Sequence, residues 1–298
     1  MDSALRGWLL DADPSIRWQV MRDLEAVPVK RWSAERGRVA GEGWGARLLG
    51  LQADDGNWGG GAYSPKWVST TYTMLLLRHL GIEPRDRRMD TATRIVADQV
   101  RMSGPFFDYS TETCVTGMVL ALGSYFLADA TALPQPEVLL AAQRDDGGWN
   151  CKVSSNRSSF HTTISALEGL LEYERAVGGD AGLAAARHRA HEYFMDRRLM
   201  YSLRTGELVK SRWLLMSFPP RWHYDVLRCL DYLRDAGVRP DDRCDEAVDL
   251  IRSKRQSDGS WPLQGRHAGV VHFEMETPGK PSRWNTLRAL RVLAWHDS

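Results

Sequence analysis

Apolar residues recur along the chain at the spacing of helices, in segments of two alternating kinds. In the first kind, apolar side chains cover most of the helix surface, which is typical of helices buried on several sides. We expect six such helices: Pro14–Leu24, Ser64–Leu77, Thr111–Leu122, Ser158–Leu171, Pro219–Leu230 and Pro281–Leu293. The second kind carries Arg, Asp and Glu along one side, and its six members are Ser3–Leu10, Trp32–Leu51, Arg88–Val100, Pro136–Ala142, Gly182–Arg197 and Asp241–Ser253.

This alternation predicts an all-α fold, an (α/α)6 toroid with six inner and six outer helices. Helices that are apolar nearly all round belong in the inner ring. Helices with one charged side belong in the outer ring, where that side meets water. No stretch of linker-like composition divides the chain, so we expect a single domain, residues 1–298.

A turn motif repeats three times at the ends of helices of the second kind. It has the form Gln-x3-Gly-x-Trp in Leu51–Gly60 and Ala142–Cys151, and Arg255 takes the place of Gln in Arg255–Leu263. The glycine can adopt the left-handed conformation that ends a helix, and the tryptophan can pack back against that helix. Because internal repeats fix an architecture, the motif supports the prediction of paired helices.

A second motif places proline, a basic residue and tryptophan at the start of four helices of the first kind. The basic–Trp pairs are Arg17-Trp18, Lys66-Trp67, Arg221-Trp222 and Arg283-Trp284. Proline suits the first turn of a helix, where its missing N–H is not needed. If the six helices are equivalent, these positions form a ring at one end of the toroid.

Paired helices joined by Gln-x3-Gly-x-Trp turns resemble the superfamily of squalene–hopene cyclases and protein prenyltransferase β-subunits, over almost the whole chain. The resemblance implies an α/α toroid and an isoprenoid-like ligand. It does not indicate a reaction, because the turn stabilises the fold. Squalene-type cyclases also have an Asp-x-Asp-Asp acid motif and a second toroidal domain, and this chain shows neither.

Composition narrows the class of protein further. The chain has 298 residues with 39 basic and 38 acidic side chains, a balance that argues against a general nucleic-acid binder. We expect no signal peptide, and no run approaches the about 18 consecutive apolar residues of a transmembrane helix. Four cysteines in a chain of this length are too few for a disulfide framework. We therefore expect a cytoplasmic protein, of open oligomeric state.

Reactive side chains gather at the ring of helix starts. When the six helix starts are superposed, Thr113 and Phe160 take the place of tryptophan, and the next position holds Cys114, His161 and His223 on successive inner helices. Glu112 precedes Cys114 by two residues. Carboxylate, thiolate and imidazole are zinc ligands, and three of them leave a fourth position for water or substrate. The superposition therefore predicts a zinc site formed by Glu112, Cys114 and His161.

The family resemblance points to the same residues. Protein prenyltransferase β-subunits resemble this arrangement, with Asp-x-Cys on one inner helix and His on the next; Glu112, Cys114 and His161 fall at the matching places, with Glu instead of Asp. Cys151 and Asp225 would be replacement ligands. A metal-free alternative keeps Cys114 as a thiolate nucleophile with His161 as its base, because a helix N-terminus lowers a thiol pKa.

The ring of helix starts also carries basic residues. These are Arg17, Lys66, Arg221 and Arg283. Together with the partial positive charge of six helix N-termini, they would attract an anionic group such as diphosphate. Trp222 and Trp284 would line the same site. The alternative is that each basic side chain stacks on its neighbouring tryptophan and has a structural role only.

Three functions follow from these patterns. We expect an enzyme, a transferase or hydrolase, that uses metal- or thiolate-assisted chemistry on an apolar, isoprenoid-like ligand with an anionic head. Its catalytic group would be Glu112, Cys114, His161, His223 and Asp225. The second function is a proton-initiated cyclase that uses one carboxylic acid. The third is a non-catalytic toroid that binds a ligand or serves as a scaffold.

Overall fold

The computed structural model describes residues Met1–Ser298 and is all-α, as the sequence predicts. Its α-helices are α1 (Ser3–Leu10), α2 (Pro14–Asp23), α3 (Val29–Gly37), α4 (Gly43–Leu49), α5 (Thr70–Leu80), α6 (Arg87–Gln99), α7 (Thr113–Phe126), α8 (Gln135–Ala142), α9 (Phe160–Val177), α10 (Ala181–Met195), α11 (Val226–Asp235), α12 (Asp245–Ser253) and α13 (Arg283–His296). Short 3-10 helices cover Phe106–Asp108, Ser211–Leu214 and Asp242–Cys244. One antiparallel pair joins β1 (Trp261–Pro262) to β2 (Pro281–Ser282). None of the helices combines the length and apolarity that crossing a membrane requires.

The six helices expected to be apolar nearly all round are α2, α5, α7, α9, α11 and α13. Two of them begin more than one helical turn later than predicted, α5 at Thr70 and α11 at Val226. In α11 the start is set by Asp225, whose carboxylate accepts a hydrogen bond from the Arg228 N–H at 2.7 Å. Lys66-Trp67 and Arg221-Trp222 therefore lie in loops, and the predicted equivalence of the four basic–Trp pairs is wrong at these two.

The segment predicted as one helix, Trp32–Leu51, is two helices, α3 and α4. Gly43 begins α4 with φ +61°, in the left-handed region where other residues are strained. A side chain at this position would also collide with the Asp13 carboxylate. The break in the helix therefore needs glycine, and helical periodicity does not reveal it.

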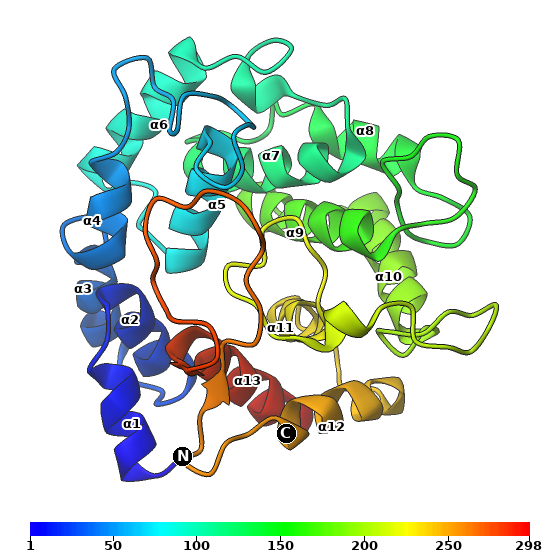
Figure 1. Ribbon diagram of the computed structural model, residues 1–298. Helices are drawn as coiled ribbons and strands as arrows, with labels where there is room; N and C mark the ends of the chain where they lie inside the picture. The colour runs from blue at the N-terminus through cyan, green and yellow to red at the C-terminus, as the bar shows by residue number, and fades with distance from the viewer.

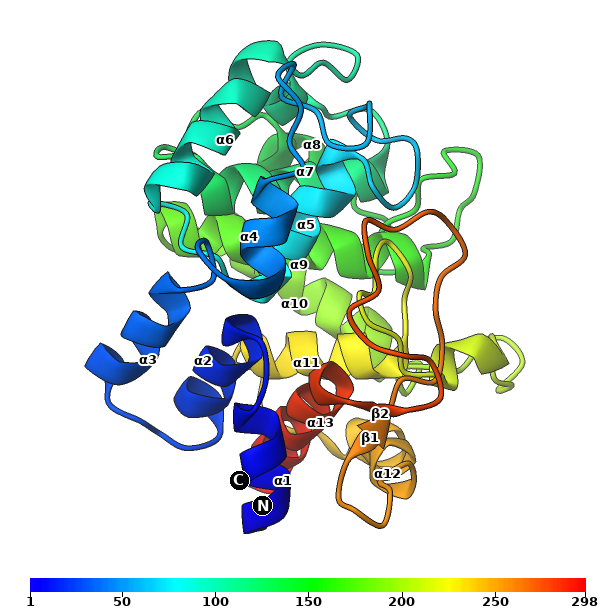
Figure 2. The ribbon, with the colours of Figure 1, turned by 60° about the vertical axis from the view of Figure 1, so that its left-hand side comes forward.

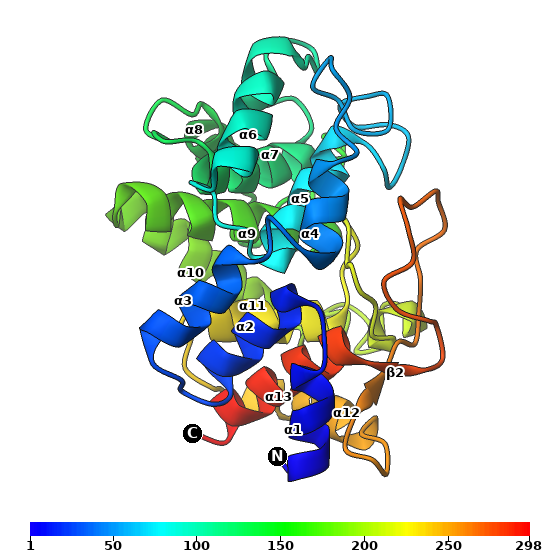
Figure 3. The same ribbon diagram turned by 90° about the vertical axis from the view of Figure 1, so that its left-hand side faces the viewer.

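The chain makes one circuit around a common centre and returns to its start, as Figure 1 shows by colour. Along this path α5 packs on α7, α7 on α9, α11 on α13 and α13 on α2. The remaining helices lie on the outside, with α3 against α2, α10 against α9 and α12 against α11. Figures 2 and 3 show the long loops gathered at one end of the molecule, which we call the mouth.

Each repeated turn connects an outer helix to the next inner helix through its tryptophan. In the second turn the Trp149 indole N–H donates to the Leu139 carbonyl in α8, at 2.7 Å. The Trp149 backbone N–H donates to the Thr163 hydroxyl in α9, at 3.0 Å. The first turn repeats both bonds with Trp58, and the third repeats them with Trp261.

The first residue of the turn motif completes this connection. The Gln52 and Gln143 side-chain amides each donate to the turn glycine carbonyl and to a carbonyl of the next outer helix. In the third turn, Arg255 Nε donates to the Gly259 carbonyl at 3.3 Å. Arg255 therefore replaces Gln in its contact with the turn, which explains why the motif tolerates it.

The centre of the circuit is filled by chain from two loops. Phe218, in the loop before α11, stacks on Trp284 of α13 with ring centroids 4.2 Å apart. The segment 264–280 passes across the mouth in Figure 1. Phe218 lines a small cavity on the mouth side and a larger one on the other side, so it separates the two.

The turn geometry predicts the effect of Thr163→Val. Valine keeps the shape but leaves the buried Trp149 N–H without its acceptor, which costs about 1–3 kcal/mol. We expect the urea unfolding midpoint to fall accordingly. In Thr91→Val, an exposed threonine of α6, the midpoint should stay within about 0.5 kcal/mol of wild type. Equal midpoints for both variants would contradict the role of the turn.

Candidate functional site

Two cysteines meet at the mouth end of α7. Cys114 lies in the first turn of α7, and Cys151 lies in the loop that follows the second repeated turn. The Cys114 backbone N–H donates to Cys151 Sγ at 3.1 Å, and the Thr162 hydroxyl donates to the same sulfur at 3.4 Å. Both thiols are partly buried and form no disulfide.

The sulfur of Cys151 occupies the position of a helix cap. Glu112, the residue before α7, makes no capping hydrogen bond with its side chain and is exposed. A free N–H at a helix N-terminus stabilises negative charge on an atom that accepts from it. The neighbouring Cys114 side chain, the Thr162 hydroxyl and the Cys114 N–H together lower the pKa of Cys151 to about 6. Contact with Cys151 and burial raise the pKa of Cys114, so Cys151 is the thiolate of the pair.

His161 faces away from this pair. Its Nδ1 accepts the Tyr224 backbone N–H at 2.7 Å, and its ring lies 5.1 Å from Trp222 and 5.6 Å from Trp213. Burial lowers the pKa of His161 to about 3. The neutral imidazole therefore carries its proton on Nε2 and uses its only lone pair on Tyr224. His161 is not placed to be the base for Cys114.

The other histidines form an aromatic stack. His223 lies between Trp222 and His267, with ring centroids 3.9 Å from each. Burial lowers the pKa of His223 to about 4 and that of His267 to about 3. Both ring nitrogens of His267 are buried without a partner. These rings are neutral and form a wall of the mouth.

The residues present do not fit the predicted zinc site. No three His, Cys, Asp or Glu side chains lie close enough together to hold a metal ion. The expected ligands divide between the sulfur pair and the histidine stack, because His161 turns toward Tyr224. Asp225, a predicted replacement ligand, is buried as the cap of α11, and burial raises its pKa. We therefore derive no zinc-dependent step.

Only two of the four predicted basic residues lie at the mouth. Lys66 is exposed, with Nζ 5.5 Å from the ring centroids of Tyr63 and Trp222. Arg221 lies over Trp67 at 5.6 Å and adopts φ +58°, a conformation that is unfavourable for arginine. Burial lowers the pKa of Arg221 to about 10.

The other two predicted anion ligands have structural partners. Arg17 forms an ion pair with Glu35 and donates to the Ala12 carbonyl, and Arg283 donates to the Trp8 carbonyl. Trp284 is buried beneath Phe218. The predicted basic ring is therefore incomplete, because Arg17 and Arg283 are bound to structural partners.

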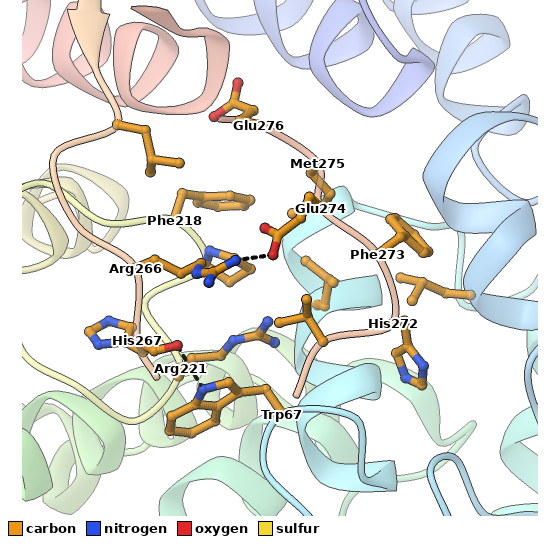
Figure 4. A pocket seen from close by; sticks show the side chains of 15 residues that line it. Trp67, Phe218, Arg221, Arg266, His267, His272, Phe273, Glu274, Met275 and Glu276 are labelled. Atoms are coloured by element: carbon orange, nitrogen blue, oxygen red, sulfur yellow. Dashed lines mark hydrogen bonds and ion pairs between the residues drawn. The ribbon is translucent and has the colours of Figure 1, made fainter. Parts of the chain in front are cut away.

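The mouth cavity has a volume of about 40 Å³. Figure 4 shows Trp67, Phe218 and Arg221 on one side and the segment from Arg266 to Glu276 around them. An ion pair between Arg266 and Glu274 spans the segment that covers the cavity. Ligand pockets usually measure about 300–1,000 Å³, so this cavity accommodates no long apolar chain, and neither Cys114 nor Cys151 lines it.

Sequence reasoning missed a second cavity, of about 340 Å³, on the other side of Phe218. All six helices of the inner circuit contribute to its wall, which contains eight arginines. The available signal was arginine inside otherwise apolar helices, as at Arg228, Arg288 and Arg291, which are all buried. Arginine is rarely buried without a partner, so these positions indicate a polar interior.

Comparison with known proteins gives little further information. No protein-family model matches the chain, and no curated protein sequence matches it. A solved structure described as a protein from Actinoplanes aligns with 96% of this chain and 91% of its own length, at 18% identity and a TM-score of 0.44. A similarity of this level carries no argument about fold or function.

The sulfur pair predicts selective labelling by limiting iodoacetamide at pH 7, followed by peptide mass spectrometry. Cys151 should be alkylated first, at least about tenfold faster than Cys114, because only the thiolate reacts. Buried Cys229 and Cys244 should stay unmodified.

A matched pair of threonine variants tests the cause of this selectivity. Thr162→Val removes one donor to Cys151 and should slow its alkylation, whereas exposed Thr111→Val should not. Preferential labelling of Cys114 would contradict the assignment of the thiolate.

Proposed function

We propose that the chain is an (α/α)6 toroid related in fold to squalene–hopene cyclases and protein prenyltransferase β-subunits. Support comes from the alternation of inner and outer helices, the three repeated turns and the contact of α13 with α2 that closes the circuit. α3 and α4 together take the place of one outer helix. The relation is a proposal about architecture and transfers no site residue by itself.

We further propose that the protein is a thiol-dependent enzyme whose nucleophile is Cys151. The single observation that carries this is the convergence of two donors, the Cys114 N–H and the Thr162 hydroxyl, on one partly exposed sulfur at a helix N-terminus. The site needs no separate base, because the thiolate is already the stable form at neutral pH. This arrangement replaces the expected pairing of Cys114 with His161.

The surroundings of the cysteines favour a substrate with an apolar body and an anionic leaving group. Lys66 is an exposed cation of the mouth without a carboxylate partner among the ion pairs, unlike Arg266, and both Lys66 and Arg221 lie within 6 Å of the Trp67 ring. Tyr63, whose hydroxyl bonds to that of Tyr72 at 2.9 Å, adds an aromatic surface next to Lys66. Arginine and lysine suit phosphate groups, and the aromatic rings suit the apolar body.

A thiolate enzyme can release an acyl group that it has bound covalently, but not an isoprenoid group, so we favour an acyl substrate. The Cys151 thiolate forms an S–C bond to the carbonyl carbon, and the bond to the leaving group breaks with its electron pair on the departing anion. Water then cleaves the thioester and restores the thiol. An isoprenoid diphosphate would instead alkylate Cys151 to a thioether, which water does not cleave. Such a substrate would label the enzyme once.

A second function, a toroid that binds a ligand without turning it over, is favoured by the filled centre. Phe218 stacks on Trp284, and segment 264–280 covers the mouth, so only about 40 Å³ is open there. This function needs the cations of the mouth but no thiolate. The two proposals therefore differ in their dependence on Cys151.

Intact-protein mass spectrometry after exposure to octanoyl-coenzyme A or farnesyl diphosphate separates them. We expect an acyl adduct that disappears with time and a prenyl adduct that persists, both at Cys151 and both absent in Cys151→Ser. Lys66→Gln should slow adduct formation about tenfold, because it removes the exposed cation. Exposed Thr111→Val is the control.

Other outcomes count against the enzyme. Adducts that form equally in Cys151→Ser would exclude this nucleophile. Binding of either probe with no adduct, unchanged in Cys151→Ser, would favour the binding toroid. If neither probe binds nor forms an adduct, the proposed substrate class is wrong.

A further inference from the structure

The central cavity has an excess of positive charge in its wall. Eight arginines line it, against four carboxylates, from Glu168, Glu172, Asp231 and Asp235. Two more carboxylates, Asp23 and Glu83, form ion pairs with wall arginines but do not line the cavity themselves. Six carboxylates against eight guanidinium groups leave two positive charges uncompensated. His79 does not add to them, because burial lowers its pKa to about 3.

Asp231 and Asp23 are each shared by two arginines, one of which lies on α13. Several wall arginines have a carboxylate to themselves, as Arg228 has Glu168 at 2.7 Å and Arg78 has Glu172 at 2.8 Å. Arg288, in contrast, shares Asp231 with Arg234, and its own contact is long, at 3.4 Å.

Arg291 is in a similar position. It shares Asp23 with Arg22. Its Nε is buried without a hydrogen-bond partner, although the residue is only 7% exposed. A buried charged donor with no acceptor is costly, and a ligand would remove that cost. Arg288 and Arg291 are three residues apart on one helix and so lie on the same face.

The partial negative charge at the end of a neighbouring helix does not compensate the charge of these arginines. The C-terminal carbonyls of α5 carry partial negative charge toward the cavity. They already have other donors: Trp18 Nε1 to the Leu80 carbonyl at 3.0 Å, and Arg36 Nε to the Gly81 carbonyl at 2.7 Å. Arg288 also donates to the Ser217 carbonyl at 3.2 Å, and Arg291 to the Gln19 side-chain oxygen at 2.7 Å. These contacts do not use all five N–H donors of either guanidinium group, so both arginines keep donors for a ligand.

We propose that this cavity binds a compact oxyanion with at least two negative charges, held by Arg288 and Arg291. Guanidinium forks match the geometry of phosphate and carboxylate oxygens equally, so oligophosphates and polycarboxylates share the required chemistry. The volume of about 340 Å³ is in the range of small-molecule pockets. The ligand reaches it past Arg22 and Arg175, whose side chains line the cavity and are 38% and 44% exposed.

This site is separate from the one at the mouth. Phe218 and Trp284 stand between them, and the cavity lies toward the opposite ends of the inner helices. The proposal therefore does not depend on Cys151 or on the proposed thiol chemistry.

Isothermal titration calorimetry of the full chain with inorganic triphosphate, and separately with citrate, tests the site. We expect saturable binding of one equivalent of at least one probe. Arg288→Gln and Arg291→Gln should each weaken it at least tenfold. Both variants should fold, because Arg234 still pairs with Asp231 and Arg22 with Asp23. Unchanged circular dichroism would verify this.

Two controls separate this cavity from the surface and the mouth. Arg94→Gln removes an exposed charge of α6, and Lys66→Gln removes the exposed cation of the mouth. Neither should change the affinity. The tighter probe identifies the oxyanion class. No binding of either probe to the wild-type protein, or an equal loss in Arg94→Gln and Arg288→Gln, would overturn the proposal, and a loss only in Lys66→Gln would assign the anion to the mouth instead.

Discussion

Three buried tryptophans tie the outer helices to the inner ones, and the placement of the candidate sites depends on them. Each indole N–H is bound to the last turn of an outer helix, and each backbone N–H is bound to a threonine of the next inner helix. Indole N–H groups and backbone N–H groups must be paired when buried, so these bonds leave little choice in how successive pairs of helices meet. The glycine two residues before each tryptophan has φ between +80° and +87°, which keeps the turn tight.

The second turn also places the sulfur pair. Cys151 follows Trp149 by two residues, and its N–H is bound to the Thr162 hydroxyl at 3.3 Å. The corresponding residues of the other turns are Gly60 and Leu263, which have no reactive group. The hydrogen bonds made by the tryptophan are therefore the same in all three turns. Only the second turn carries a reactive residue, Cys151, two positions after its tryptophan. A mobile loop could not hold Cys151 against the N-terminus of α7 in this way.

The sequence predicts the helices well because burial on several sides leaves a clear periodic pattern, and the repeated turn marks where each pair ends. It does not predict where α5 and α11 begin, since the Asp225 cap starts α11 and the Trp67 N–H before α5 is bound to the distant Val270 carbonyl, and periodicity shows neither. Equivalent positions therefore do not superpose, and His161 turns to Tyr224 instead of Cys114. In the sequence, the only sign that Cys151 belongs to a site is its position next to the second Gln-x3-Gly-x-Trp turn. To predict the wall of the central cavity, one must know which faces of six helices converge. A single sequence does not show this.

Titration of the thiolate absorbance in the ultraviolet is the measurement that tests the role of Cys151 most directly. Wild-type protein should show a transition near pH 6 that is absent in Cys151→Ser. Below this pH the thiol is protonated and the cap of α7 loses its charge, so a small loss of stability should accompany the transition. A wild-type curve without any transition below about pH 8, the range of an ordinary thiol, would show that the contacts of Cys151 do not activate it.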